Sequence, residues 1–256
     1  MWITGASSGI GEALAQRFAR AGSRLILSSR RENELSRVAR LCSGAESVEV
    51  FPLDLSRPES MSDAVHRVLH TAGCVDVTVH NGGVSQRSFA ADTAYNIDDV
   101  LMRTNYLGPV ALTKALLPSM RLRRSGHFIV VTSVLGKFGL PGRSGYCASK
   151  HALHGFFDTL RAESWRDGIK VTLVLPGFVR TNVSINALTA TGAIHGKMDE
   201  GTAAGVKPDV CAERIIAAAA SGKPEIAVVQ IKERAALYLN RFAPKLFNRV
   251  IRDREI

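Results

Sequence analysis

Tyr146 and Lys150 are the pair of residues in this sequence best suited to transferring a proton. They are four residues apart in the helical stretch "SGYCASKHALHGFFDTLRAE", so both side chains would lie on one face of a helix. The pKa of an ordinary tyrosine, about 10, is too high for efficient proton transfer at neutral pH. A neighbouring ammonium group stabilises the phenolate and lowers that pKa. The pair predicts an acid/base unit of the kind that carbonyl reduction requires, although this spacing also occurs by chance.

Ser133 and Asn105 are the polar residues that could assist such a unit. Ser133 ends the apolar run "HFIVVTS", and ligands of open α/β sheets bind where the strands end. Its hydroxyl group could hold a substrate carbonyl as negative charge builds on the oxygen. Asn105 lies inside a helical pattern, where asparagine is unfavourable, which indicates a specific role or a surface position equally well. No cluster has the spacing of metal ligands, so we expect no metal.

A glycine-rich turn opens the chain, in "TGASSGIGEALAQRFARAG", and could hold a phosphate group. Its glycines, Gly5, Gly9 and Gly11, would let the backbone approach a ligand closely, and a helix begins near Gly9. The free N–H groups and partial positive charge of that helix start suit a pyrophosphate. The spacing T-G-x-x-x-G-x-G differs from the common G-x-G-x-x-G fingerprint. We predict a dinucleotide turn that also includes Ser7, Ser8 and Ile10; a turn without a ligand is the alternative.

The next β-rich run ends in "LSSRREN", which bears on the choice of dinucleotide. Many NAD-binding folds have an acidic residue here that holds the ribose hydroxyl groups, but this sequence has Ser29, Arg30 and Arg31. A guanidinium group binds phosphate well, so Arg30 predicts NADP(H). The alternative is two solvated arginines at a helix start. Asp54, in "PLDLS", is expected at the adenine edge or as a helix cap.

The elements that position these residues alternate between short apolar strands and longer amphipathic helices. Near-continuous apolar strands are typical of a parallel sheet that is covered on both faces. We therefore predict an α/β fold with a doubly wound parallel sheet (Rossmann) in a single domain, residues 1–230. Residues 183–206 are predicted to form a lid, and residues 231–256 a basic amphipathic segment. The helical patterns cover residues 11–21, 32–42, 58–71, 97–121 and 146–166.

Composition excludes several classes of protein. The formal net charge is +10, which indicates a basic surface, an anionic ligand or an anionic membrane. The sequence has no basic stripe with interleaved aromatic residues, which disfavours nucleic acid as a partner. The four cysteines are far apart and are expected to be reduced. No apolar run is long enough to span a membrane, so we expect the chain as given to be soluble.

The motifs together resemble the short-chain dehydrogenase/reductase family. They are "TGASSGIG", "DLS", "HNGG", Asn105, Ser133, "YCASK" and "PGFVRT", and they follow the family's order. The resemblance implies a catalytic tetrad of Asn105, Ser133, Tyr146 and Lys150, with Tyr146 as the acid/base. It also implies that the cofactor contacts Gly5, Ser8, Ile10, Arg30, Asp54, Leu55, Asn81, Val179 and Thr181. In "HNGG", His80 and Gly82 replace an asparagine and an alanine of the family, which puts the rigidity of that turn in doubt.

The function expected from these features is that of an NADP(H)-dependent oxidoreductase. It would reduce a carbonyl, or oxidise a secondary alcohol, of an apolar substrate such as a lipid or steroid, since the lid carries Ile194 and Met198. A non-catalytic NADP(H)-binding or scaffold protein of the same fold is the alternative. An NAD-dependent alcohol oxidase is another, which Arg30 disfavours.

The expected partners follow partly from the resemblance. It implies a homodimer through the two long helices, and in the helix at 146–166 the small residues Ala148, Ala152 and Gly155 would allow close contact; burial within one subunit is the alternative. It also implies association with the membrane of the endoplasmic reticulum or peroxisome, on which residues 231–256 would rest. Only Met1 to Thr4 precede the glycine turn, so we expect the natural product to have an apolar segment upstream of Met1.

Overall fold

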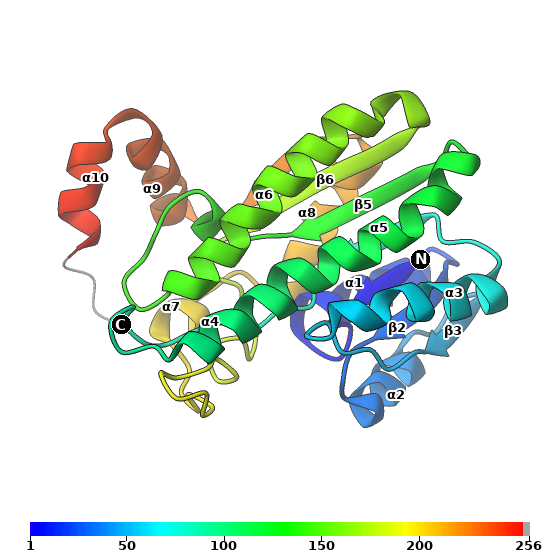
Figure 1. Cartoon of the computed structure of the whole chain (residues 1–256), viewed down its shortest axis with the longest axis horizontal. Coiled ribbons are helices and arrows are strands. Elements are labelled where there is room, and N and C mark those ends of the chain that lie inside the picture. Colours follow the sequence, from blue (N-terminus) through cyan, green and yellow to red (C-terminus); the bar gives the residue numbers. More distant parts are fainter. Residues whose placement is uncertain (253–256) are drawn as a thin grey trace.

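The computed structural model describes residues 1–252, which form a parallel sheet with helices on both faces (Figure 1). Within these residues the sheet has seven strands in the order β3-β2-β1-β4-β5-β6-β7, and every neighbouring pair is parallel. The chain reverses its direction of winding between β1 and β4, which is where ligands of such sheets bind. The strands are β1 (Trp2–Thr4), β2 (Arg24–Ser28), β3 (Ser47–Val50), β4 (Val77–His80), β5 (Gly126–Val131), β6 (Ile169–Pro176) and β7 (Glu225–Val228).

Two apolar cores hold the helices against the sheet. One core packs α3 (Met61–Ala72), α5 (Gly108–Leu122) and α6 (Ser144–Ser164) against one face; in Figure 1, α5 and α6 lie in front of the sheet. The other core packs α1 (Gly9–Arg20), α2 (Glu32–Leu41) and α8 (Pro208–Ala220) against the opposite face. Because both faces are covered, the strands are apolar throughout rather than alternating. The predicted doubly wound fold is confirmed.

The predicted helix at 97–121 is wrong in one respect, because the structure divides it. α4 (Tyr95–Met102) and α5 are joined by a π-helical turn, Arg103–Leu107, in which the Gly108 N–H bonds the Arg103 carbonyl. This wider turn accompanies two close approaches. Asn105 reaches the backbone of Val84, and Gly108 packs so tightly on Leu55 that an added Cβ would lie 2.2 Å from the Leu55 carbonyl oxygen. Such π-turns often occur at functional sites.

Residues 231–251 form two helices, α9 (Ile231–Phe242) and α10 (Pro244–Ile251), at the end of the molecule farthest from β3 (Figure 1). A capping box between Gln230 and Glu233 begins α9. Phe247 is buried and contacts Phe138 edge-on at 5.0 Å between ring centroids, while Leu237 and Leu239 also pack on the core. The predicted basic segment is thus anchored by one apolar face. Its last residues, 253–256, lie outside the described part of the chain. No helix among residues 1–252 is long and apolar enough to cross a membrane.

Candidate active site

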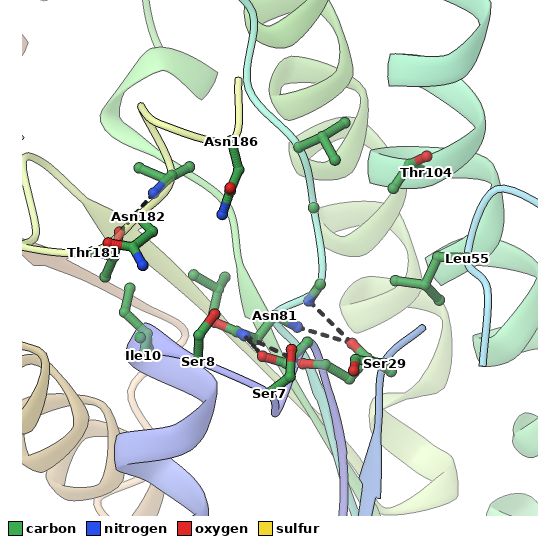
Figure 2. A pocket seen from close by; sticks show the side chains of 18 of the residues that line it. Ser7, Ser8, Ile10, Ser29, Leu55, Asn81, Thr104, Thr181, Asn182 and Asn186 are labelled. Atoms are coloured by element: carbon green, nitrogen blue, oxygen red, sulfur yellow. Dashed lines mark hydrogen bonds between the residues drawn. The ribbon is translucent and has the colours of Figure 1, made fainter. Parts of the chain in front are cut away.

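A cleft of about 760 Å³ lies at the carboxyl ends of the strands. Its walls come from the glycine turn, the ends of β2, β4 and β5, helix α6 and the segment 183–206, which was predicted to form a lid. Figure 2 shows Ser7, Ser8 and Asn81 close together, with Asn182 and Asn186 on one side and Leu55 and Thr104 on the other. The predicted residues that line this cleft are Gly5, Ser7, Ser8, Gly9, Ile10, Arg30, Asp54, Leu55, Asn81, Ser133, Tyr146, Lys150, Val179 and Thr181. Gly11 and Asn105 do not line it.

The glycine turn has the geometry of a phosphate cradle. Gly5 and Gly9 adopt φ angles of 64° and 60°, a left-handed conformation that favours glycine. Ser8 begins α1 without a side-chain capping bond, so the N–H groups of the first helical turn remain available to phosphate oxygens. Gly11 has a different role from the expected one. An added Cβ there would lie 2.3 Å from the Gly5 carbonyl oxygen, so Gly11 lets α1 approach the turn from behind.

The turn after β4, which departs from the family pattern, is firmly held. The backbone N–H groups of Asn81 and Gly82 donate to the Thr4 hydroxyl group at 3.1 and 3.2 Å, and the Asn81 amide donates to the Thr4 and Gly5 carbonyls. His80 is buried beside Phe128 and Phe157, and its Nε2 lies 2.8 Å from the Thr113 hydroxyl group. These contacts answer the doubt about rigidity, because His80 occupies a packed apolar site.

Ser133, Tyr146 and Lys150 lie together on the cleft wall. The Lys150 ammonium group is 5.6 Å from the centre of the Tyr146 ring and donates to the Val131 carbonyl at 3.0 Å. Burial lowers the pKa of Lys150 to about 8. Burial is also the largest influence on the pKa of Tyr146, which it raises, while a hydrogen bond with Ser133 acts in the opposite direction. The expected lowering of the tyrosine pKa is therefore wrong for this structure, and Tyr146 holds its proton at neutral pH.

Asn105 lies behind the cleft wall. Its side-chain oxygen accepts from the Val84 N–H at 2.8 Å, and its amide nitrogen donates to the Val84 carbonyl at 2.9 Å and to the Ser149 hydroxyl group at 3.0 Å. The Ser149 hydroxyl group in turn donates to the Tyr146 carbonyl. In this structure Asn105 ties the turn after β4 to the helix that carries Tyr146. Sequence reasoning gave Ser149 no role, because its distant partner gives no local signal.

The end of β2 brings two arginines to the cleft instead of one. Arg30 and Arg31 both line it, and the Arg31 guanidinium donates to the hydroxyl groups of Ser7 at 3.1 Å and Ser8 at 3.3 Å. Arg31 is adjacent to Arg30 in "SSRREN", but its contact with the glycine turn depends on the fold. Asp54 lines the cleft and accepts from the Ser56 N–H at 2.9 Å, which closes a turn. It does not cap a helix, because the residues at the N-cap positions that follow are Arg57 and Ser60.

Asn182, Asn186 and Leu188 line the cleft without having been predicted to do so. They belong to a stretch of small residues whose sequence has no regular hydrophobic period. The sequence therefore predicted a lid but not which of its side chains face the cleft. Within residues 1–252, no group of three or more His, Cys, Asp or Glu side chains could hold a metal ion, and Cys42, Cys74, Cys147 and Cys211 are free thiols.

Residues 1–191 match the family model described as short chain dehydrogenase. The chain belongs to the short-chain dehydrogenase/reductase family. It is 46% identical to "Dehydrogenase/reductase SDR family protein 7-like" of Anopheles gambiae, over 98% of this chain and 81% of that protein. It is 42% identical to "Dehydrogenase/reductase SDR family member 7B" of Bos taurus, over 98% of this chain and 80% of that protein. The fold matches an alcohol dehydrogenase from the archaeon Thermococcus sibiricus, complexed with 5-hydroxy-NADP, with a TM-score of 0.77, 28% identity and coverage of 90% and 96% of the two chains. This membership makes the chain an oxidoreductase with a nicotinamide cofactor and a small-molecule substrate.

The buried His80 gives a prediction for stability. Burial lowers its pKa from 6.5 to about 3, so between these values the unfolded chain binds a proton that the folded protein excludes. The stability that neutral His80 permits is complete above pH 6.5 and falls as the pH drops toward the folded pKa. His80→Asn cannot be protonated at this position. When the pH falls from about 7 to 5.5, we expect its free energy of unfolding to drop by about 1.3 kcal/mol less than that of the wild type. Urea denaturation at both pH values measures this difference.

The matched control is His66→Asn, because His66 is exposed on α3. Its pH dependence should equal that of the wild type. Equal pH dependence in all three proteins would show that His80 is protonated without unfolding.

Proposed function

We propose that this protein is an NADP(H)-dependent oxidoreductase that reduces a carbonyl, or oxidises a secondary alcohol, of an apolar substrate. The observation that carries the proposal is the placement of Ser133, Tyr146 and Lys150 in the same cleft as the glycine turn. When bound, the nicotinamide supplies or accepts the hydride. The residues of this chain then have to hold the substrate oxygen and move one proton.

Tyr146 is the proton donor in the reducing direction. Burial raises the pKa of its phenol, so the group is protonated at neutral pH, and its cleft position lets it donate to a substrate oxygen. The Ser133 oxygen accepts from the Leu135 N–H at 3.1 Å, which fixes the side chain beside Tyr146, where its hydroxyl group would bond the substrate oxygen once substrate is bound. Lys150 is held by the Val131 carbonyl, from where its ammonium group would stabilise a developing phenolate. These roles favour catalysis over a non-catalytic dinucleotide-binding role.

The preference for NADP(H) rests on the cationic end of the cleft. Ser29, Arg30 and Arg31 line it where an acidic residue would hold the ribose of NAD. The Arg31 guanidinium is already oriented by the Ser7 and Ser8 hydroxyl groups, so two cations face the site expected for a 2′-phosphate.

The apolar character of the substrate rests on the opposite end of the cleft. Val84 and Val100 line it from the body of the protein, and Val183, Leu188 and Ile194 line it from the lid at 183–206. Met198, which was expected to contact the substrate, does not line the cleft. An apolar substrate would bury these side chains, and the lid would close over it and exclude water.

Tyr146→Phe tests the catalytic assignment. We expect turnover to fall by about 100-fold or more, because phenylalanine lacks the proton that the substrate oxygen must receive. NADPH binding should be unchanged. The measurement is NADPH oxidation with a panel of lipid, steroid and retinoid ketones, together with fluorescence titration of NADPH.

Tyr95→Phe is the control, because Tyr95 is exposed at the start of α4. It should behave as the wild type. Normal turnover in Tyr146→Phe would refute the assignment, and a wild-type protein that binds NADPH but reduces none of the ketones would favour the non-catalytic alternative.

Arg30→Asp tests the choice of cofactor. We expect NADPH binding to weaken by about 2–3 kcal/mol, the size of a charge-assisted contact with phosphate, and NADH binding to change far less. Titration calorimetry with both dinucleotides measures the difference. Arg40→Asp reverses a charge at an exposed position of α2 and controls for the effect of net charge on dinucleotide binding. Equal weakening for both dinucleotides would remove the support for NADP(H).

A membrane contact through α9 and α10 is a further part of the proposal. Large apolar side chains are exposed on these helices, with Phe242 at 77% and Leu246 at 50%. Basic residues of the same helices surround them, namely Lys232, Arg234, Arg241, Lys245 and Arg249. This combination suits the surface of an anionic membrane, and the family resemblance suggests that of the endoplasmic reticulum or peroxisome.

Flotation with lipid vesicles tests the membrane contact. We expect the protein to float with vesicles of phosphatidylcholine and phosphatidylserine, and the fraction that floats to fall as salt is added. The double variant Phe242→Ser/Leu246→Ser should float much less. Leu122→Ser removes an apolar residue at the end of α5 that is even more exposed, and this variant should float normally. Identical flotation of both variants would exclude these helices as the contact.

We also propose a homodimer through α6. Ala148 and Gly155 are exposed, and an added Cβ on Gly155 would meet no atom within 4 Å in the described chain. This helix face is therefore not used by packing within the subunit and has the small residues that a close helix contact needs.

A further inference from the structure

Four consecutive polar residues, Ser85 to Ser88, are buried between the lid and the helix that carries Tyr146. None of them is more than 9% exposed, and Gln86 is fully buried. Buried polar groups need hydrogen-bond partners, so the partners of this segment indicate what it holds in place. They lie on two sides, in the first turn of α6 and in the lid at 183–206.

On the first side, Gln86 caps the helix that carries Tyr146. Its side-chain oxygen accepts from the N–H groups of Gly145 at 2.8 Å and Tyr146 at 3.3 Å. The amide nitrogen of Gln86 donates to the hydroxyl groups of Thr93 at 2.9 Å and Ser144 at 3.2 Å. The residue at the N-cap position of α6, Arg143, makes no side-chain capping bond, so Gln86 supplies the acceptor that this helix start lacks.

On the second side, the segment pairs with the lid as a short parallel bridge. The Leu188 N–H donates to the Ser85 carbonyl at 2.9 Å, and the Arg87 N–H donates to the Leu188 carbonyl at 2.8 Å. Leu188 is also one of the lid residues that line the cleft. A movement of the lid at Leu188 therefore acts directly on the backbone beside Gln86.

Asp199 of the lid joins both sides through charge. The Arg87 Nε atom lies 3.2 and 3.1 Å from its two carboxylate oxygens, and an Nη atom of Arg143 lies 3.4 Å from one of them. Both guanidinium groups are buried, so each would raise the electrostatic energy of the other without this carboxylate. Because Arg143 is the N-cap residue of α6, the lid is tied to the catalytic helix by a second route.

We propose that Gln86, Arg87 and Asp199 are positioning residues that couple closure of the lid to the placement of Tyr146. Substrate that fills the cleft presses on Leu188, and the Ser85–Ser88 segment transmits this to the first turn of α6. The donor is then fully aligned only when the lid is closed. This inference rests on the proposed function, in which Tyr146 donates the proton to the substrate.

Hydrogen exchange tests the coupling without an activity assay. Asp199→Asn keeps the shape of the side chain but removes the charge that holds Arg87 and Arg143. We expect the amides of Gly145 and Tyr146 to exchange at least about fivefold faster in this variant, although they are in α6 and the substitution is in the lid. Glu200→Gln, the neutralisation of the adjacent exposed carboxylate, should leave their exchange rates unchanged.

Arg87→Lys is the second variant, and it serves if Asp199→Asn does not fold. It keeps the charge but loses the paired geometry, so it should give a smaller change in the same direction. Faster exchange confined to the lid would overturn the proposal.

Turnover supplies the second arm of the test. Gln86→Met removes both sets of hydrogen bonds with little change in volume. We expect the single-turnover rate of reduction, normalised to the concentration of NADPH-binding sites, to fall by about tenfold. Gln86→Glu should recover much of this rate, because a carboxylate accepts from the same two N–H groups and the surrounding hydroxyl groups can donate to it. Equal rates for Met and Glu variants would indicate a merely structural role and overturn the proposal. A wild-type protein without any turnover, but with the exchange coupling intact, would refute the proposed function alone.

Discussion

The close approach of three backbone segments at the end of β1 is the constraint on which the site depends. The Gly5 carbonyl lies where a Cβ on Gly11 would be 2.3 Å away, and a Cβ on Gly5 would be 2.6 Å from the Gly82 Cα atom. Only residues without side chains allow α1, the glycine turn and the turn after β4 to meet there. The Asn81 amide then bonds two carbonyls of the first turn, which fixes the floor of the cleft. The glycine turn and the turn after β4 are thus parts of one packed unit.

The features that the sequence predicts well are those with a local cause. The short runs of apolar residues indicate strands of a sheet that is covered on both faces, and the 3.6-residue period of the helices follows from backbone geometry alone. Tyr146 and Lys150 share a helix face for the same reason, and the structure places both on the cleft wall. The two arginines after β2 follow from their position at the end of a strand, although only the fold reveals that Arg31 contacts the glycine turn.

The features that sequence reasoning missed depend on partners far away in the chain. Asn105 was recognised as unusual in a helix, but its bonds to Val84 and Ser149 require the π-turn, which has no simple sequence pattern. Gln86 reads as an ordinary loop residue until α6 is placed against it. The pKa of Tyr146 is a similar case: the Lys150 ammonium group was predicted to lower it, whereas burial, which the spacing of residues does not reveal, raises it.

Burial of Tyr146 and Lys150 determines the protonation state in which the proposed reaction begins. A tyrosine with a raised pKa is a weaker acid, but it keeps its proton at neutral pH, so Tyr146 begins the proposed reduction in the protonated form that a donor requires. Lys150, whose pKa burial lowers to about 8, is still mostly charged at pH 7 and can stabilise the phenolate once the proton has left. The apolar surroundings that make each group costly to ionise also strengthen the attraction between the two charges when both are present. In the proposed mechanism, the burial that keeps the proton on Tyr146 before the reaction therefore also strengthens the attraction by which Lys150 would stabilise the phenolate.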